Sequence, residues 1–270
     1  MQNKSILHIL FTIEQFFEER NIMQNYRLEI EYDGTRYYGW EHQPNVDTIQ
    51  GKLENVLAEM CSIKAENIEL NGAGRTDAGV HAKDMTANVK LNTDKTTLEI
   101  RDYLNRYLPE DIAVTSVERA GERFHARYNA SGKTYRYSIY DGKVKPVFDR
   151  RYYTPLENEL DIDAMRSAAG YLIGEHDFKS FCGNPKMKKS TVRKIDKIDI
   201  LRSGGYVYIS IHGSGFLQNM VRIISGTLIE IGLHKRPADE MKTILEARDR
   251  QKAGYTAPAK GLCLIKTDYD

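Results

Sequence analysis

Residues 72–82 read GAGRTDAGVHA, and the chain on either side gives this stretch its meaning. It contains three glycines, one histidine, one arginine at Arg75 and one carboxylate at Asp77. Strand-like runs precede it over residues 67–70 and follow it over residues 85–91, which predicts an irregular loop between two strands. Glycine permits positive φ and close approach of another segment, so this loop can present Asp77 and Arg75 outward from a rigid sheet, where catalytic residues commonly lie.

The loop also has a purely structural alternative, in which Asp77 only caps a glycine-rich turn. The residue types alone leave both interpretations open. Phosphate binding is the weaker functional option, because the stretch has neither G-x-G-x-x-G spacing nor the Lys-Ser or Lys-Thr that follows glycine in a P-loop.

Composition is typical of a globular protein, since 41% of the 270 residues are hydrophobic and 29% are charged. The formal net charge is only +1, so any binding to nucleic acid has to come from local basic patches. Cys61, Cys182 and Cys263 are dispersed without a C-x-x-C pair, which argues against disulfides or a zinc site and favours the reducing cytoplasm. No apolar run approaches the roughly 18 residues needed to span a bilayer, so we expect no membrane contact.

We divide the chain into an N-terminal extension over residues 1–24, a first half over residues 25–122 and a second half over residues 123–270. Residues 1–23 read as an isolated amphipathic helix. We expect translation to begin at Met23, which would leave the preceding residues untranslated.

The first half predicts the order strand, helix, strand, strand, helix, strand, which is that of a ferredoxin-like unit. Residues 26–32 and 112–117 alternate as strands, Thr48 is a candidate N-cap, and residues 98–108 predict a helix that Pro109 ends. In the second half the patterns predict both strands and helices, which are in chain order residues 162–173 (helix), 193–201 and 206–212 (strands), 216–231 and 238–248 (helices), and 262–267 (strand). No convincing internal sequence repeat relates the two halves.

Two segments of the second half combine features of RNA-binding surfaces. Residues 133–140, KTYRYSIY, alternate cations with aromatic rings, either as an ordinary sheet with cross-strand tyrosine pairs or as stacking planes with phosphate contacts for RNA. A basic run without acidic residues follows later and is either a solvated face or an RNA-backbone contact loop; it contains Lys186, Lys188, Lys189 and Arg193.

The predicted helix over residues 216–231 is apolar and carries a single cation, Arg222. An isolated buried charge is costly, so this arginine should point at a carboxylate, and Asp77 is the natural candidate. The His176-Asp177 pair has no third ligand nearby, so we favour a structural loop there and expect no metal site.

The GRTDAGVH portion of the opening stretch closely resembles the signature of the tRNA pseudouridine synthase A (TruA) family. Further segments resemble that family in the same order, so that the resemblance covers about residues 25–269: IEYDGT with GW (residues 30–35 and 39–40), FHAR (124–127), YRY (135–137), FL with MVR and GTL (216–228), and TAPAKGL (256–262).

The resemblance implies an α+β fold in which two ferredoxin-like (RRM-like) halves form one extended antiparallel sheet flanked by helices, with the active cleft between them. It implies an isomerase that converts uridine to pseudouridine in the tRNA anticodon stem-loop, at positions 38–40. In that reaction the N1–C1′ bond breaks, the uracil turns, and C5 joins C1′. The resemblance further implies a homodimer, one tRNA touching both subunits, and no metal or organic cofactor.

Carried over by position, Asp77 is implied as the catalytic carboxylate, which either attacks C1′ or removes the 2′ proton. Tyr135 is implied to stack on the target base, Arg222 to pair with Asp77 and keep it ionised, and Arg75 to replace the flipped uridine. We expect further RNA contacts from the basic run named above and from five residues at the start of the second half: Phe124, His125, Ala126, Arg127 and Tyr128.

Glu41 and Asp47 depart from the family pattern, because they stand where relatives commonly carry neutral or basic residues. Acidic groups near a phosphate path weaken RNA binding. This leaves open a related enzyme that modifies another RNA, such as ribosomal RNA, and a non-catalytic RNA-binding protein on the same scaffold. A hydrolase is disfavoured, because Asp77 has no second carboxylate in its motif.

Overall fold

The structure is a computed structural model that describes residues 23–184 and 186–270, so the helix expected over residues 1–23 lies almost wholly outside the described residues. The first half follows the predicted order, and β1 already begins at the last residue of the expected extension. Its elements are β1 (Gln24–Tyr32), α2 (Ile49–Cys61), β2 (Leu70–Gly72), β3 (His81–Leu91), α3 (Thr97–Tyr107) and β4 (Ile112–Arg119), with short 3-10 turns at Gly34–Arg36 and Ala65–Asn67.

The helices of the first half begin where the sequence provides caps. The Thr48 hydroxyl accepts the Gly51 N–H at 3.2 Å, as expected for an N-cap. Thr96 and Glu99 form a capping box in front of α3, in which each side chain bonds the backbone N–H of the other. The start of each of these helices is therefore determined locally.

The second half repeats the same order and adds short elements at its margins. It contains β5 (Ala130–Tyr140), β6 (Thr154–Pro155), α4 (Ile162–Gly170), β7 (Gly174–Asp177), β8 (Val192–Ser203), β9 (Tyr206–Gly213), α5 (Met220–Gly232), α6 (Glu240–Ala247) and β10 (Leu262–Tyr269), with 3-10 turns at Lys179–Phe181 and Ala259–Gly261. Apolar residues at every second position of β5 and β9 are buried, and α4 and α5 pack on this sheet.

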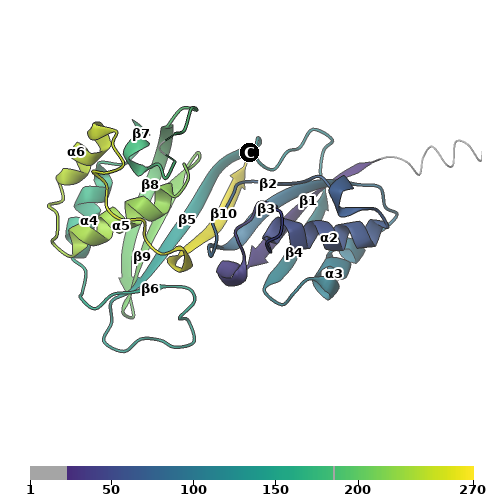
Figure 1. Ribbon diagram of the computed structural model, residues 1–270, viewed down its shortest axis with the longest axis horizontal. Coiled ribbons are helices and arrows are strands. Elements are labelled where there is room, and N and C mark those ends of the chain that lie inside the picture. The colour runs from purple at the N-terminus through teal and green to yellow at the C-terminus, as the bar shows by residue number, and fades with distance from the viewer. Residues whose placement is uncertain (1–22, 185) are drawn as a thin grey trace, which may run out of the picture.

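One sheet runs through the whole molecule in the order β4-β1-β3-β10-β5-β9-β8-β7, while β2 pairs with β3 and β6 with β5. Figure 1 shows the two halves side by side, with β10 between the strands of the first half and β5. The four principal strands of each half lie in the order β4-β1-β3-β2 and β10-β5-β9-β8. In both halves the last strand along the chain lies beside the first, followed by the third and then the second. The expected α+β fold with two ferredoxin-like halves in one sheet is confirmed, whereas the boundary at residues 122 and 123 stays a prediction.

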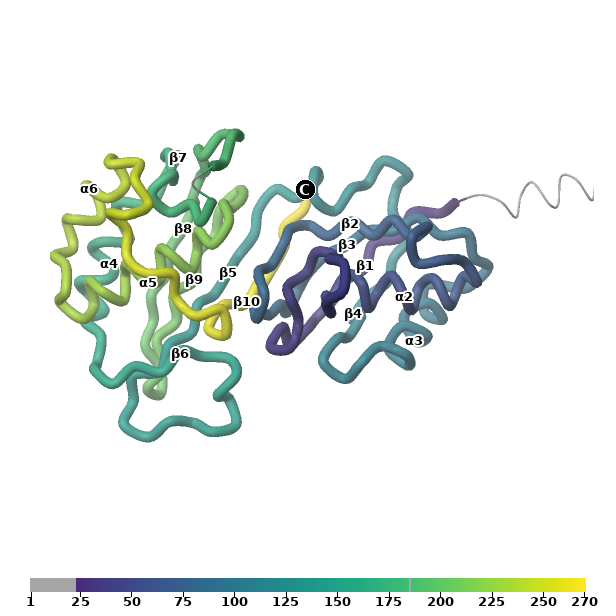
Figure 2. Tube along the Cα trace, in the orientation of Figure 1, coloured from purple at the N-terminus to yellow at the C-terminus, as the bar shows by residue number. Residues whose placement is uncertain are grey.

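The junction between the halves differs from the rest of the sheet because its pairing is parallel. His81 and Ala82 of β3 pair with Cys263 and Leu264 of β10, whereas every other neighbouring pair along the principal order is antiparallel. The trace in Figure 2 shows the C-terminal strand reaching back into the middle of the molecule. His81 and Ala82, the last two residues of the glycine-rich stretch over residues 72–82, therefore form the side of the junction that belongs to the first half.

Several predicted boundaries were wrong. The strand-like run over residues 67–70 becomes a strand only from Leu70, in β2, and the helix predicted over residues 162–173 ends at Gly170. The strand predicted to start at residue 85 begins at His81, because its first residues pair with β10 and with β1. The helix predicted from residue 216 begins at Met220, because Asn219 has φ +58° and interrupts helical geometry. Among the described residues, no helix has both the length and the apolar character needed to cross a membrane.

Candidate active site

The candidate active site is built on the loop between β2 and β3, which neighbouring segments hold in place. The Trp40 N–H donates to the Thr76 carbonyl at 3.1 Å, and the Tyr32 hydroxyl lies 2.8 Å from Thr76 Oγ1. Gly39 has φ +95°, and a Cβ there would come within 2.5 Å of the Thr76 carbonyl oxygen. These contacts fix the backbone of Thr76 and therefore the position of its neighbour Asp77.

A cation from the second half meets Asp77. Arg222, in the first turn of α5, places Nη1 3.3 Å from Asp77 Oδ2, and the two side chains are 17% and 32% exposed. The same guanidinium donates to the Ala257 carbonyl at 2.8 Å and to Asn219 Oδ1 at 2.9 Å. The pairing expected from a lone cation in an apolar helix is confirmed, and the additional acceptors fix the orientation of the guanidinium.

Tyr135 lies on β5 beside this pair and lines a cleft together with Asp77, although it is only 7% exposed. Its ring meets Phe216 edge-on, with centroids 5.2 Å apart and planes inclined by 86°. Burial, and to a lesser extent the negative charge of Asp77, raise the pKa of the Tyr135 hydroxyl well above its usual value of 10.0. The phenol is therefore neutral at physiological pH.

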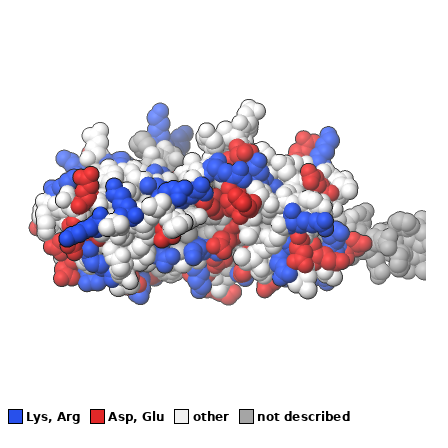
Figure 3. Space-filling model, turned by 90° about the horizontal axis from the view of Figure 1, so that it is seen from below, with Lys and Arg blue, Asp and Glu red and all other residues white. Residues whose placement is uncertain are grey.

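Asp77 and Tyr135 line a cleft of about 1050 Å³ to which both halves contribute, and Arg222 contacts Asp77 without lining the cleft itself. Among the described residues, the only carboxylates that line it are Asp77 and Glu41, whereas the cations number seven: Arg75, Arg127, Lys133, Lys186, Lys188, Lys189 and Arg193. A chain of net charge +1 thus concentrates positive charge in one place. On the face of the molecule shown in Figure 3, by contrast, basic and acidic side chains are intermingled. Such a cleft suits a polyanion.

The residues expected at the start of the second half divide into two groups. Arg127 lines the cleft. Ala126 is fully buried, so its side chain offers no surface to RNA, and Phe124 is half-buried against the core with its ring 5.4 Å from that of Tyr269. The rings of His125 and Tyr128 pack 4.2 Å apart outside the cleft, although Tyr128 is highly exposed. Only Arg127 of these five is therefore brought to the other candidate residues.

Lys133 was not singled out from the sequence, yet it lines the cleft beside Arg127. Burial, together with the charge of Arg127, lowers the pKa of the Lys133 ammonium below its usual value of 10.5. A signal was available, because Lys133 precedes Tyr135 by two positions on one strand, and such residues share a face. The sequence pattern identified Lys133 only as one member of the alternating segment over residues 133–140.

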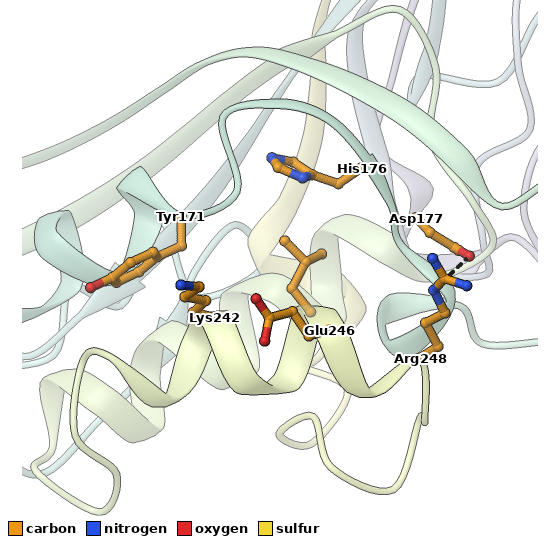
Figure 4. A pocket seen from close by; sticks show the side chains of 7 residues that line it. Tyr171, His176, Asp177, Lys242, Glu246 and Arg248 are labelled. Atoms are coloured by element: carbon orange, nitrogen blue, oxygen red, sulfur yellow. Dashed lines mark ion pairs between the residues drawn. The ribbon is translucent and has the colours of Figure 1, made fainter.

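A second hollow, of about 550 Å³, lies between α6 and β7 and contains the His176-Asp177 pair (Figure 4). His176 donates through Nε2 to the Ile173 carbonyl at 2.9 Å. Asp177 accepts from the Thr191 hydroxyl at 2.5 Å and pairs with Arg248 at 3.3 Å. Both residues lie on β7, where they pair with β8, so the expectation of a loop there was wrong, although the contacts of both side chains are structural. No group of three or more potential metal ligands occurs in the described part of the chain.

Comparison with known proteins places this geometry in a family. The sequence profile of the tRNA pseudouridine synthase family matches residues 29–129 and 168–270. The tRNA pseudouridine synthase A of Bacillus sp. (strain KSM-64) is 49% identical over 90% of this chain and 98% of that protein. A tRNA pseudouridine synthase A 2 of Clostridium tetani (strain Massachusetts / E88) is 45% identical over 92% of this chain and 99% of that protein.

Among solved structures, the archaeal box H/ACA sRNP Nop10–Cbf5 complex is similar over 88% of this chain and 47% of that chain. The sequence identity is 11% and the TM-score 0.35, a likeness too distant to bear on function. The relatives at 45% and 49% identity match almost their whole length, and the family profile matches most of this chain. The chain therefore belongs to the tRNA pseudouridine synthase family.

Proposed function

We propose that this protein isomerises uridine to pseudouridine in tRNA and that Asp77 is its catalytic carboxylate. One observation carries the assignment of the residue: Asp77 lies in a strongly basic cleft, held by a cation from the other half and beside a buried aromatic ring. The names of the relatives support tRNA as the substrate.

The reaction rearranges bonds without oxidation or a departing group. The N1–C1′ bond breaks, the uracil turns while it stays in the cleft, C5 bonds to C1′, and the proton lost from C5 is balanced by the one gained at N1. A carboxylate can assist either by attacking C1′ or by removing the 2′ proton. Both routes need an anion at the sugar, and Arg222, 3.3 Å from Asp77, is placed to stabilise that anion.

Uridine has to leave the RNA stack before it can reach Asp77, which costs a few kcal/mol. Stacking of the flipped base on Tyr135 returns about 1–3 kcal/mol, so the two quantities are comparable. Arg75, 63% exposed and lining the cleft, is placed to fill the vacancy in the RNA. The basic residues from Lys186 to Arg193 line the same cleft and are placed to contact the backbone.

The proposal includes the finer expectations from the family resemblance. The target uridines are those at positions 38–40 of the anticodon stem-loop, the working unit is a homodimer that binds one tRNA across both subunits, and the location is the cytoplasm. The basic cleft with its buried aromatic ring supports an RNA substrate, because single-stranded loops are recognised by stacking and by backbone contacts together.

The test uses unmodified tRNA transcripts with uridines at positions 38, 39 and 40. They are incubated with wild type, with Asp77→Ala, and with the control variant Asp163→Ala. The control removes an exposed carboxylate on α4 that pairs with Arg166. Pseudouridine is mapped by carbodiimide labelling and primer extension. We expect stops with wild type and Asp163→Ala, and a loss of at least about a thousandfold in rate with Asp77→Ala.

Equal activity of Asp77→Ala and wild type would contradict the assignment of the residue. If wild type binds tRNA but produces no stops, the same assay on ribosomal RNA separates a related enzyme with another target from a protein that only binds RNA. Binding of tRNA to Asp77→Ala should persist, because the removed group is an anion in a basic cleft.

A further inference from the structure

The carboxylates of the cleft each have an arginine partner. Asp77 pairs with Arg222 across the two halves, and Glu41 Oε1 lies 2.6 Å from Arg75 Nη2. The second pair lies at the mouth, because the Glu41 and Arg75 side chains are 45% and 63% exposed. Arg75 is therefore occupied by a carboxylate on the path by which RNA enters.

The backbone sets this pair face to face. The Trp40 N–H donates to the Thr76 carbonyl, and Glu41 and Arg75 are the next residues of the same two segments. The Trp40 carbonyl in turn accepts the Gln50 N–H at 3.0 Å, which ties the segment to the start of α2. The meeting of the two side chains thus follows from fixed backbone positions.

We propose that Glu41 is a positioning residue that holds Arg75 at the mouth of the RNA-free cleft and competes with RNA for it. The inference rests on the proposed function, since it requires RNA to enter this cleft. A guanidinium binds a carboxylate and a phosphate through the same planar array of donors. Glu41 therefore occupies the guanidinium of Arg75 in the absence of RNA, and Arg75 has to leave Glu41 before it can enter the RNA.

The pair adjusts affinity and does not close the cleft. An exposed ion pair changes an equilibrium by about 1.5- to 5-fold, and salt screens it. Glu41 also repels the RNA backbone directly, so the two effects have to be separated. They differ in their dependence on Arg75, because only the competition disappears when Arg75 is absent.

The experiment is a double-mutant cycle on tRNA affinity with Glu41→Gln, Arg75→Gln and the double variant. Asp47→Asn is the matched control, since it removes the same charge from the same segment but Asp47 pairs with Lys52 at 2.6 Å and does not line the cleft. Thermal unfolding of each variant confirms that it is folded. Dissociation constants are measured by fluorescence anisotropy across a series of salt concentrations.

We expect Glu41→Gln to lower Kd by about 1.5- to 5-fold when Arg75 is present and to change it little in the Arg75→Gln background. Freeing one cation should steepen the dependence of log K on log salt by about 0.7–0.9. KM should fall with Kd while kcat does not rise. The same change in both backgrounds, or an equal effect of Asp47→Asn, would overturn the proposal in favour of simple repulsion. No change in Kd with Glu41→Gln would overturn it as well.

The outcome is separable from that of the proposed function, because the cycle measures binding and can be repeated in the Asp77→Ala background. Pseudouridine formation by wild type without coupling between Glu41 and Arg75 would overturn the competition and leave the proposed function standing. Absence of tRNA binding by wild type would overturn both.

Discussion

The two halves of the molecule share one strand order and differ in the charges they bring to the cleft. The first half supplies both carboxylates, Asp77 and Glu41. Of the seven cations that line the cleft among the described residues, only Arg75 belongs to the first half, and the other six belong to the second. Tyr135 and Arg222 also come from the second half.

This division explains why the site lies at the junction. A ferredoxin-like unit used twice provides two similar sheets, and joining β3 to β10 brings the loop of one beside the helix end of the other. Neither half alone offers Asp77 together with the cation that meets it. The repeated strand order provides the framework, and the proposed chemistry depends on side chains that only one of the two halves supplies.

Apart from the loss of Asp77 itself, the largest effect should come from breaking the contact between the halves with Arg222→Gln. This variant removes the cation from Asp77 and leaves the Ala257 carbonyl without that donor. Because displacement of a catalytic group by about 1 Å can cost about a hundredfold, we expect the single-turnover rate to fall by about a hundredfold or more.

The matched control is Arg236→Gln, which removes a guanidinium with similar exposure from the same half, where it pairs with Glu230 at 2.7 Å and with Glu240 at 2.6 Å. Its thermal stability should fall comparably while its rate does not. Equal rates for the two variants would mean that the contact between the halves has no catalytic role.

The next largest effect concerns the ring that the second half supplies. Tyr135→Ala should lower kcat/KM by about 5- to 150-fold, the equivalent of the roughly 1–3 kcal/mol of one stacked base. It should also cost about 3–5 kcal/mol of unfolding free energy, because the ring is buried against Phe216. Tyr135→Phe keeps the ring, so its kcat/KM and its free energy of unfolding should fall much less than those of Tyr135→Ala. Steady-state kinetics and chemical denaturation measure the two quantities.

The hydroxyl of Tyr135 predicts a dependence of stability on pH. Burial raises its pKa above the ordinary value of 10.0, so the stabilisation of the neutral phenol is complete below about pH 10 and is lost as pH rises through the folded-state pKa. Melting temperatures from about pH 8 to pH 11 should therefore fall less steeply for Tyr135→Phe than for wild type. Identical slopes would show that this hydroxyl does not contribute.

The smallest effect should come from single cations of the basic run. Replacing Lys188 with Gln should weaken binding to all RNAs alike and reduce the salt slope of binding by about 0.7–0.9, since one phosphate contact is lost. Lys64→Gln, on an exposed lysine of the first half that does not line the cleft, should do neither. A selective loss of one RNA over another would instead assign Lys188 a role in base recognition.

Local patterns in the sequence were sufficient for most elements. The cap at Thr48 and the alternation along β5 depend on residues within a few positions of each other. The pairing of Arg222 with Asp77, 145 residues away, was also predictable, because a lone cation in an apolar helix requires a partner. The family resemblance then supplied the roles that spacing could not.

Other features required the tertiary structure. The parallel junction of His81 with Cys263, the burial of Ala126 and the pairing of Glu41 with Arg75 each depend on segments that sequence patterns treat separately. The two halves also share a strand order without a detectable sequence repeat.

The sequence by itself determined the loop that carries Asp77, the order of the principal strands and helices, and the resemblance to the family. Only the tertiary structure decided which charges face one another across the cleft. The physical reason is range: periodicity and capping act over one or two turns of chain, whereas an ion pair in a cleft depends on long-range packing that brings distant backbone segments within a few ångströms.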